Sequence, residues 1–251
     1  MFETLNTTNL LYLDIETTPI AESYDNLNEN YRSAWKYFCK QNYPDLELDN
    51  ETLNKLWKTR ASLIPEFSMI ICVSIGEYFL EKESNELTFK TWTRFLKNEK
   101  DNENLLLTDI KNYLDKKSAK KLITHNGKDF DYAFMIRRFI CNKILPPVQL
   151  QIFNKKPWEI ELFDTKEIWK FGSSKSTSLV ALCVALNIPS PKEDIDGSMI
   201  YEKYYDLTNR NENMKKIAKY CSNDVRALAL IVQYLYLLDN PDNILPEIKY
   251  V

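Results

Sequence analysis

Glycine and histidine are scarce in this sequence, and an excess of basic residues is missing. Its 251 residues include four glycines and one histidine, and 33 lysines and arginines stand against 36 aspartates and glutamates, for a net charge of −3. This balance excludes a broad basic surface, so any contact with nucleic acid has to be local and assisted by cations. The glycines lie at motif edges, where we expect turn geometry to account for them: Gly76, Gly127, Gly172 and Gly197.

Cysteine pairs and long apolar runs are also missing. The five cysteines are odd in number and scattered, with no CxxC pair, which argues against a disulfide framework or a zinc site. No apolar run approaches the ~20 residues of a membrane span, and the first residues lack the basic region and apolar stretch of a secretion signal. We therefore expect a cytoplasmic protein without membrane contact, folded as one domain over residues 1–251.

The order of the predicted elements indicates an α/β fold. Apolar, β-rich segments predict strands over 10–15, 69–80, 86–92, 121–125 and 158–165. Helical periodicity predicts helices over 102–114, 129–143, 177–186 (with Ser178 as N-cap) and 211–238. Residues 22–60 are helical in period, with Trp35 and Trp57 as expected anchors. This order predicts a mixed five-stranded sheet flanked by helices, with a helical insertion at 22–60 after the first strand.

Two carboxylates, Asp14 and Glu16, end an apolar run in "LLYLDIETTP". Side chains alternate along a strand, so both carboxylates project to one face and Ile15 to the other. The pair alone is a weak signal, because an acidic-x-acidic triplet should occur about five times by chance in a chain this acidic. A solvated strand end explains it equally well.

A second acidic motif, "THNGKDFDYAFMIRRF", places Asn126 and Gly127 in a turn between a strand and a helix, with Asp131 in the first helical turn. The helix dipole favours an acid at that position, which supplies a purely structural explanation. Phe130 and Tyr132 flank Asp131, and aromatic neighbours suit a site where bases stack near a phosphate. Burial in the core is the commoner fate of such aromatic residues.

The third motif is "KYCSNDVRALAL", in which Tyr220 and Asp224 are four residues apart and share one face of the last predicted helix. Such a pair is often only a surface or core-edge feature. Its weight comes from the combination: D-x-E on the first strand, N-x-x-x-F-D at a helix start and Y-x-x-x-D on the last long helix.

This ordered set resembles the tyrosine-containing subclass of the DEDD 3′–5′ exonucleases. The segments "RASLIPEFSMIICVSIG", "HNGKDFDYAFMIRRF", "KKPWEIELFDTKEIWKFG" and "IPSPKEDIDGSM" look like the bacterial predicted 3′–5′ exonucleases related to the proofreading domain of family-B DNA polymerases. The resemblance covers nearly the whole chain, is weakest over 22–58, and implies an RNase H-like (DnaQ-like exonuclease) fold. Ser68 replaces the family's usual glycine before the second strand, which we expect to adjust a turn and leave the chemistry unchanged.

The resemblance implies a catalytic set of Asp14, Glu16, Asp131, Tyr220 and Asp224. Close carboxylates repel one another, by roughly 4 kcal/mol per pair at about 4 Å and an effective dielectric constant of about 20. They therefore need cations to stay ionised together. Oxygen ligands favour Mg²⁺ or Mn²⁺, and we expect two such ions. By the resemblance, Asp14 bridges both ions, Glu16 and Asp224 complete the first site, and Asp131 holds the second ion. Two such ions activate a water and stabilise the leaving 3′-oxygen of a phosphodiester, and Tyr220 orients that water.

The position of the histidine indicates the subclass. Histidine-containing relatives place a histidine a few residues before the final aspartate, whereas the single histidine here, His125, precedes Asn126. His125 therefore cannot fill that role, and Tyr220 is the remaining candidate. We expect His125 to make a hydrogen bond at the end of a strand.

Candidate substrate-binding residues are Thr17, Asn126, Phe130, Tyr132 and Trp158. Trp158 stands beside two lysines in "NKKPWEI", a pattern typical of a phosphate-and-stacking patch and equally of a core tryptophan next to solvated lysines. The acidic loop 192–198 lacks the distal glutamate of a calcium loop, and we interpret it as a structured surface loop, with substrate contact as the lesser alternative.

We expect a metal-dependent 3′–5′ exonuclease that releases 5′-mononucleotides from single-stranded DNA or recessed 3′ ends. Two alternatives stay open: an exonuclease acting on RNA, because discrimination of the 2′-hydroxyl depends on sterics around the 3′ sugar, and a nucleic-acid-binding module that has lost catalysis. The presence of all five candidate catalytic residues counts against the second. A proofreading role would require a polymerase or repair partner, because these 251 residues contain no polymerase domain.

Overall fold

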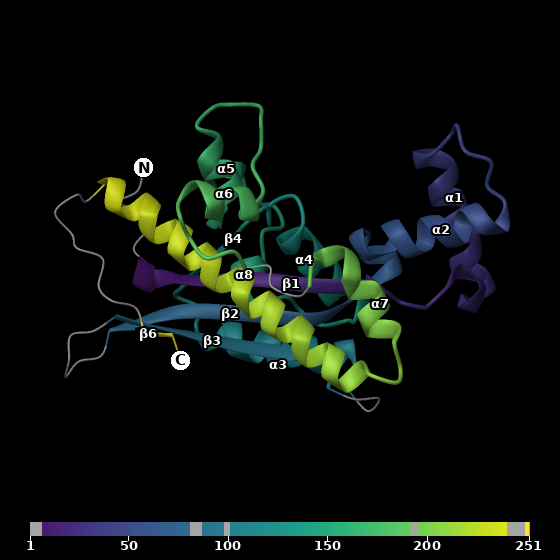
Figure 1. Ribbon diagram of the computed structural model, residues 1–251, viewed down its shortest axis with the longest axis horizontal. Coiled ribbons are helices and arrows are strands. Elements are labelled where there is room, and N and C mark those ends of the chain that lie inside the picture. The colour runs from purple at the N-terminus through teal and green to yellow at the C-terminus, as the bar shows by residue number, and fades with distance from the viewer. Residues whose placement is uncertain (1–6, 81–86, 98–100, 192–194, 240–248, 251) are drawn as a thin grey trace.

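A six-stranded sheet with the order β5-β4-β1-β2-β3-β6 forms the centre of the protein. The computed structural model describes residues 7–80, 87–97, 101–191, 195–239 and 249–250 (Figure 1). The strands are β1 (Leu10–Pro19), β2 (Ser68–Leu80), β3 (Leu87–Phe95), β4 (Lys121–Thr124), β5 (Leu162–Asp164) and β6 (Lys249–Tyr250). β2 pairs antiparallel with β1 and β3, while β4 and β5 add parallel to β1. The predicted mixed five-stranded sheet is confirmed, and the two-residue β6 extends it beside β3.

Helices cover both faces of this sheet, as predicted. They are α1 (Glu29–Asn42), α2 (Asn50–Arg60), α3 (Glu103–Asp115), α4 (Asp131–Cys141), α5 (Thr165–Lys170), α6 (Leu179–Ala185), α7 (Ile200–Tyr205) and α8 (Arg210–Asp239). Figure 1 shows α8 running diagonally across β1, β2 and β3 on one face, while α3 lies behind β2 and β3 on the other. The predicted N-cap of α6 is confirmed, because the Ser178 hydroxyl accepts a hydrogen bond from the backbone N–H of Ala181.

Alternation along β1 decides which side chains face which helix. Leu10 and Tyr12 pack against the apolar side of α8 in one buried cluster. The next side chains on that face of the strand are Asp14 and Glu16, so the surface under α8 changes from apolar to acidic within one strand. Ile15 points to the other face and is buried there.

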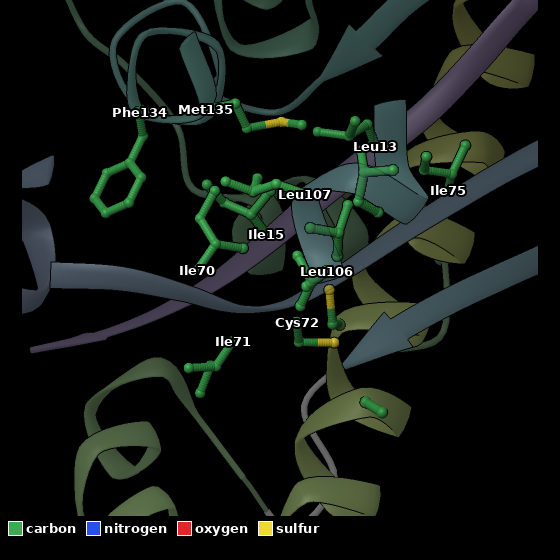
Figure 2. Close-up of a cluster of buried hydrophobic side chains, with 14 of the residues drawn as sticks. Leu13, Ile15, Ile70, Ile71, Cys72, Ile75, Leu106, Leu107, Phe134 and Met135 are labelled. Carbon is green, nitrogen blue, oxygen red and sulfur yellow. The ribbon is translucent and has the colours of Figure 1, made fainter. Parts of the chain in front are cut away.

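The opposite face of β1 builds the main core. Figure 2 shows Leu13 and Ile15 of β1 beside Leu106 of α3 and Met135 of α4, all of them buried. Each such side chain contributes about 1.5–3 kcal/mol through removal of its apolar surface from water. This packing fixes α4 against the sheet and thereby places Asp131, the first residue of α4, next to β1.

The insertion after β1 consists of α1 and α2, which lie beyond one end of the sheet (Figure 1). It has its own core around Trp35 and Trp57, which are both fully buried with ring centroids 5.0 Å apart in a T-shaped contact. The indole N–H of Trp35 donates to the carbonyl of Leu53, and that of Trp57 donates to the carbonyl of Ala21. Both tryptophans are therefore the predicted anchors.

The predicted strand over 158–165 is wrong at its start. Only Leu162–Asp164 of this segment is paired as a strand, and Pro157–Glu159 form a 3-10 turn. Pro157 suits the first position of that turn, and the Glu159 carboxylate accepts the backbone N–H of Lys156 at 2.9 Å. The helices α5 and α7 escape prediction because each has six residues, too few to show a helical period.

Turn geometry does not account for every glycine, which corrects a second expectation. Gly76 lies inside β2, opposite Tyr12 of β1, and a Cβ there would come within 2.3 Å of the Phe89 ring and 2.7 Å of the Val225 side chain. Gly76 therefore allows α8 to approach the sheet closely. Ser68 is the first residue of β2 in an ordinary extended conformation, and its hydroxyl donates to the carbonyl of Ile64 at 2.6 Å.

A buried ion pair between Glu103 and Arg138 joins α3 to α4. The Arg138 guanidinium donates to both carboxylate oxygens of Glu103, at 2.9 and 2.5 Å, and to the carbonyl of Pro65 at 2.8 Å. Glu103 also accepts the backbone N–H of Ile70 at 2.8 Å, which attaches the pair to β2. Because all partners are satisfied, the pair is tolerated in the interior.

We expect Arg138→Met to lower the free energy of unfolding by about 3–5 kcal/mol, because the carboxylate of Glu103 would stay buried without its counter-ion. Urea unfolding followed by circular dichroism measures this loss. The matched control is the neighbouring Arg137→Ala. Arg137 is exposed and lies 3.6 Å from Glu66, so its loss should cost less than about 1 kcal/mol. Equal effects of the two variants would contradict the role of the buried pair.

Candidate active site

The first two candidate ligands stand on β1 at the level where its pairing with β2 becomes irregular. Asp14 pairs with Ser74 and Glu16 with Cys72, and the register then shifts between Glu16 and Thr17. Irregularities of this kind bend a strand and redirect side chains, and they are common next to active sites. Glu16 is buried, with 8% of its surface exposed.

Asp131 is held in place by a tight turn between β4 and α4. Asn126 adopts a left-handed backbone conformation (φ 70°), and a Cβ at Gly127 would lie 2.0 Å from the Thr124 hydroxyl oxygen, so the turn requires glycine there. At the end of this turn the Asp131 carboxylate accepts backbone hydrogen bonds from its own N–H and from that of Ile15. The second of these bonds joins the start of α4 directly to the strand that carries Asp14 and Glu16.

α8 supplies the remaining residues from above the sheet. The thiol of Cys221 donates to the carbonyl of Asp14 at 3.4 Å, which seats this part of the helix on β1. Side-chain atoms of Asp14, Glu16 and Cys221 lie within 4.8 Å of one another. Tyr220 and Asp224 occupy the same helix, and the Tyr220 hydroxyl is hydrogen-bonded to the Asp224 carboxylate. The structure thus brings all five predicted catalytic residues to one place.

Burial and mutual repulsion raise the pKa of the clustered carboxyls. For Asp14, burial is the largest cause, followed by the charges of Asp224, Glu16 and Asp131. The pKa of Glu16 is raised by burial and by the same two aspartates, Asp224 and Asp131. Burial also raises the pKa of Asp131, to about 7, against the hydrogen bonds that it accepts from the backbone.

The surroundings of Tyr220 make its hydroxyl unsuited to act as a general base. Burial raises the pKa of its hydroxyl, and the charges of Asp224, Glu16 and Asp14 raise it further. The hydroxyl therefore stays protonated at neutral pH and serves as a hydrogen-bond donor and acceptor, which fits a positioning role.

The donor set fits hard divalent cations. One carboxylate oxygen of Asp14 (Oδ2) is buried without a hydrogen-bond partner, and such an orphaned acceptor is costly unless a cation or proton satisfies it. Cys221 is the odd member of the cluster, but burial raises the pKa of its thiol. We therefore interpret Cys221 as a hydrogen-bond donor, and the carboxylates as the ligands that Mg²⁺ or Mn²⁺ would prefer.

Thr17 leads from this cluster into a cleft of about 720 Å³. Its hydroxyl donates to the carbonyl of Ser62 at 2.7 Å. One wall of the cleft comes from the end of the insertion, with Lys58 and Thr59, and the other from α7 and the turn before it, with residues such as Tyr201. The insertion thus helps to shape the space beside the carboxylates.

The other predicted substrate-binding residues do not all lie beside the clustered carboxylates. Asn126 and Phe130 lie in the turn before Asp131, Phe130 being partly buried against the core. Tyr132 is a core residue, because it is 2% exposed and its hydroxyl donates to the carbonyl of Phe163 at 2.6 Å; no ring face is left for a base. Trp158 is 77% exposed and precedes the amino end of β5, opposite the end where the carboxylates gather.

His125 makes the predicted hydrogen bonds at the end of β4. Its Nε2 donates to the carbonyl of Thr177 at 3.1 Å, and its Nδ1 lies 3.0 Å from the Thr165 hydroxyl. Burial lowers the pKa of the ring, so the histidine is neutral at neutral pH and acts as a structural link. In the acidic loop, residues 192–194 lie outside the described residues, and Asp196 caps the short turn that begins at Gly197.

Sequence reasoning missed Asp164, the last residue of β5. Its buried carboxylate accepts the backbone N–H groups of Asn126, Lys128 and Lys166 at 2.8, 3.0 and 2.9 Å. The Lys166 ammonium in turn donates to the Asn126 side chain at 2.7 Å. Asp164 thereby organises the turn that carries Asp131, and its place at a strand end before a helix, as an N-cap, is the signal that could have revealed it.

Comparison with known families identifies the class of protein. The sequence matches the RNase H superfamily over residues 62–236, more than half of the chain, and the chain belongs to that superfamily. The match includes Asp131, Tyr220 and Asp224 and begins after β1. No curated protein matches the sequence. Membership of this superfamily supports a nuclease-type function, and nucleases of this kind use divalent metal ions.

A solved structure shows the same fold over most of the chain. The family B DNA polymerase from the hyperthermophilic archaeon Pyrobaculum calidifontis aligns with a TM-score of 0.55 at 12% sequence identity, over 91% of this chain. The chain spans 24% of the length of that polymerase. Among the described residues, no helix is long and apolar enough to cross a membrane.

We expect Asp14→Asn to stabilise the protein in EDTA, and more so at about pH 8 than at about pH 5. The pKa values of the clustered carboxyls are raised above those in the unfolded chain, so the folded state binds more protons, and its stability is full at low pH and falls as pH rises through the folded pKa values. The gain in Tm should be on the order of 5 °C at the higher pH.

Differential scanning calorimetry checks this expectation, with Asp45→Asn, an exposed carboxyl on the insertion, as the control that should not change. Added Mg²⁺ should raise the Tm of the wild type more than that of Asp14→Asn, because it binds the intact cluster. If rising pH in EDTA stabilises the wild type relative to Asp14→Asn, the clustered carboxylates do not repel one another as expected.

Proposed function

We propose that this protein is a 3′–5′ exonuclease of the tyrosine-containing DEDD type, which releases 5′-mononucleotides from single-stranded DNA or from 3′ ends of DNA. The observation that supports this most is the convergence of Asp14, Glu16, Asp131 and Asp224 from β1, α4 and α8, with their raised carboxyl pKa values. A cluster of this kind is costly as a structural feature and suits the binding of cations.

Asp14 and Glu16 would hold two divalent cations together with Asp131 and Asp224. When bound, two such ions activate a water and stabilise the leaving 3′-oxygen. The chain's own contribution is to fix the carboxylates before substrate arrives: hydrogen bonds from the backbone orient Asp131, and the thiol of Cys221 ties the carbonyl of Asp14 to α8. Such preorganisation saves reorganisation during the reaction.

Tyr220 would orient the attacking water through its protonated hydroxyl, with Asp224 as its anchor. The terminal nucleotide would lie in the cleft that begins at Thr17. Its lining includes three acids and one lysine, Lys58, which suits an uncharged base and sugar better than a further phosphate. Asn126 and Phe130 would border the opposite side of the reacting phosphate.

Two alternatives are kept. RNA as the substrate is compatible with the same site, because the choice depends on the space around the 2′-hydroxyl. A binding module without catalysis is the second, and the intact carboxylate cluster speaks against it. A polymerase or repair partner and a location in the cytoplasm stay predictions from the sequence.

The decisive experiment uses 5′-labelled single-stranded DNA and RNA of the same sequence, with Mg²⁺ or Mn²⁺. We expect a descending ladder on DNA that disappears in EDTA and in the variant Asp14→Ala, because a cation ligand is then lost. A ladder on RNA alone would mean that the substrate is RNA and not DNA. Retained binding with no ladder on either strand would leave the non-catalytic module as the better explanation.

We expect Tyr220→Phe to lower kcat by about 10- to 100-fold, because the water loses its orienting partner, while the Mn²⁺ affinity, measured by calorimetry, stays within about threefold. Tyr234→Phe, a partly exposed tyrosine further along α8, is the matched control and should leave kcat unchanged. An unchanged kcat in Tyr220→Phe refutes the positioning role of that hydroxyl.

A further inference from the structure

Lysines gather at both ends of β5, the outermost strand of the sheet next to β4. At its carboxyl end, next to the candidate active site, the backbone N–H groups of Lys128 and Lys166 bond to Asp164. Beyond its amino end, Lys121 and Lys155 line a hollow of about 160 Å³. Together with Lys156 and Trp158, these four lysines are called the β5-edge surface.

Three of the acids on this edge make local bonds. Glu161 pairs with Lys121 at 2.6 Å, and Glu159 accepts the backbone N–H of Lys156. Glu167, on α5, pairs with the side chain of Lys170. Lys155 and Lys156 form no ion pair among the described residues, so their ammonium groups are available to an anionic partner.

Trp158 gives this surface a second property. Its side chain is 77% exposed, and the ammonium of Lys156 lies 5.2 Å from its ring centroid. Phe153, on the same loop, is 89% exposed. Exposed aromatic rings among lysines are the elements with which proteins hold single strands, by stacking bases and pairing phosphates.

The two ends of the β5-edge surface are separated by β5 itself. From Glu161 to Asp164 the extended chain covers about 10 Å, a distance that a few nucleotides of a single strand can span. A strand whose 3′ end lies at the carboxylates could therefore reach Lys155, Lys156 and Trp158 with nucleotides on the 5′ side of the terminal one.

We propose that the β5-edge surface binds the single strand upstream of the 3′ end, through its phosphates and stacked bases. This inference rests on the proposed function for the position of the 3′ end. It predicts that affinity grows with strand length beyond the nucleotides that occupy the active site, and that this gain depends on Lys155, Lys156 and Trp158.

The test measures fluorescence anisotropy of 5′-labelled oligothymidine of about 4 and about 16 nucleotides, in EDTA so that no hydrolysis occurs. Wild type is compared with Lys155→Glu/Lys156→Glu and with Trp158→Ala. The control Lys36→Glu/Lys40→Glu reverses the same number of charges on exposed positions of α1. A matched oligouridine strand shows whether RNA is held in the same way.

We expect Lys155→Glu/Lys156→Glu to weaken binding of the long strand by at least about tenfold and to lower its salt slope by about 1.4, the value for two phosphate contacts on a single strand. Trp158→Ala should weaken binding by about 5- to 150-fold with an unchanged salt slope. Binding of the short strand should stay the same in every variant.

Three results would overturn the proposal: equal affinity of wild type and both variants for the long strand, an equal loss in the Lys36→Glu/Lys40→Glu control, or an equal loss for short and long strands. The first would leave a protein partner as the better explanation of the exposed rings. Because binding is measured without metal, this outcome is independent of whether the protein hydrolyses nucleic acid; failure of the ladder experiment would refute the proposed function alone.

Discussion

The structure depends on keeping four carboxyl groups close together where water is largely excluded. Burial alone raises the pKa of Asp14 and Glu16, and each neighbouring charge raises it further. Among the described residues, neither Asp14 nor Glu16 forms an ion pair of the kind that Arg138 forms with Glu103. The protein therefore carries an electrostatic cost at its centre, and protons or divalent cations are what relieve it.

Hydrogen bonds and packing in the rest of the fold offset this electrostatic cost. Three elements bring ligands together, and each is joined to the others by a short-range bond: Asp131 to the backbone of Ile15, and Cys221 to the carbonyl of Asp14. Behind them, the Glu103–Arg138 pair and the apolar core under β1 keep α3 and α4 in position. Stability from well-packed regions thus offsets repulsion at a site that cannot be well packed.

Much of this arrangement was predictable from local patterns in the sequence. The alternation around Ile15 placed both β1 carboxylates on one face, and the spacing of Tyr220 and Asp224 placed them on one side of a helix. The role of Asp164 and the burial of Tyr132 were not predictable in this way, because their partners are distant in the sequence. Asp164 accepts N–H groups of residues 38 and 36 positions earlier, and Tyr132 donates to a carbonyl 31 positions later. Trp158 shows the same limit, because a tryptophan beside lysines gives the same sequence pattern whether it is buried in a core or exposed on a surface.

Gly76 has a consequence that reaches beyond packing. It lies beneath α8 at Val225, the residue next to Asp224, and leaves no space there for even a methyl group. The absence of a side chain in the middle of a strand therefore determines the height at which the helix rests, and with it the distance between Asp224 and the carboxylates of β1. A residue without a side chain thus sets the spacing of carboxylates that it does not contact.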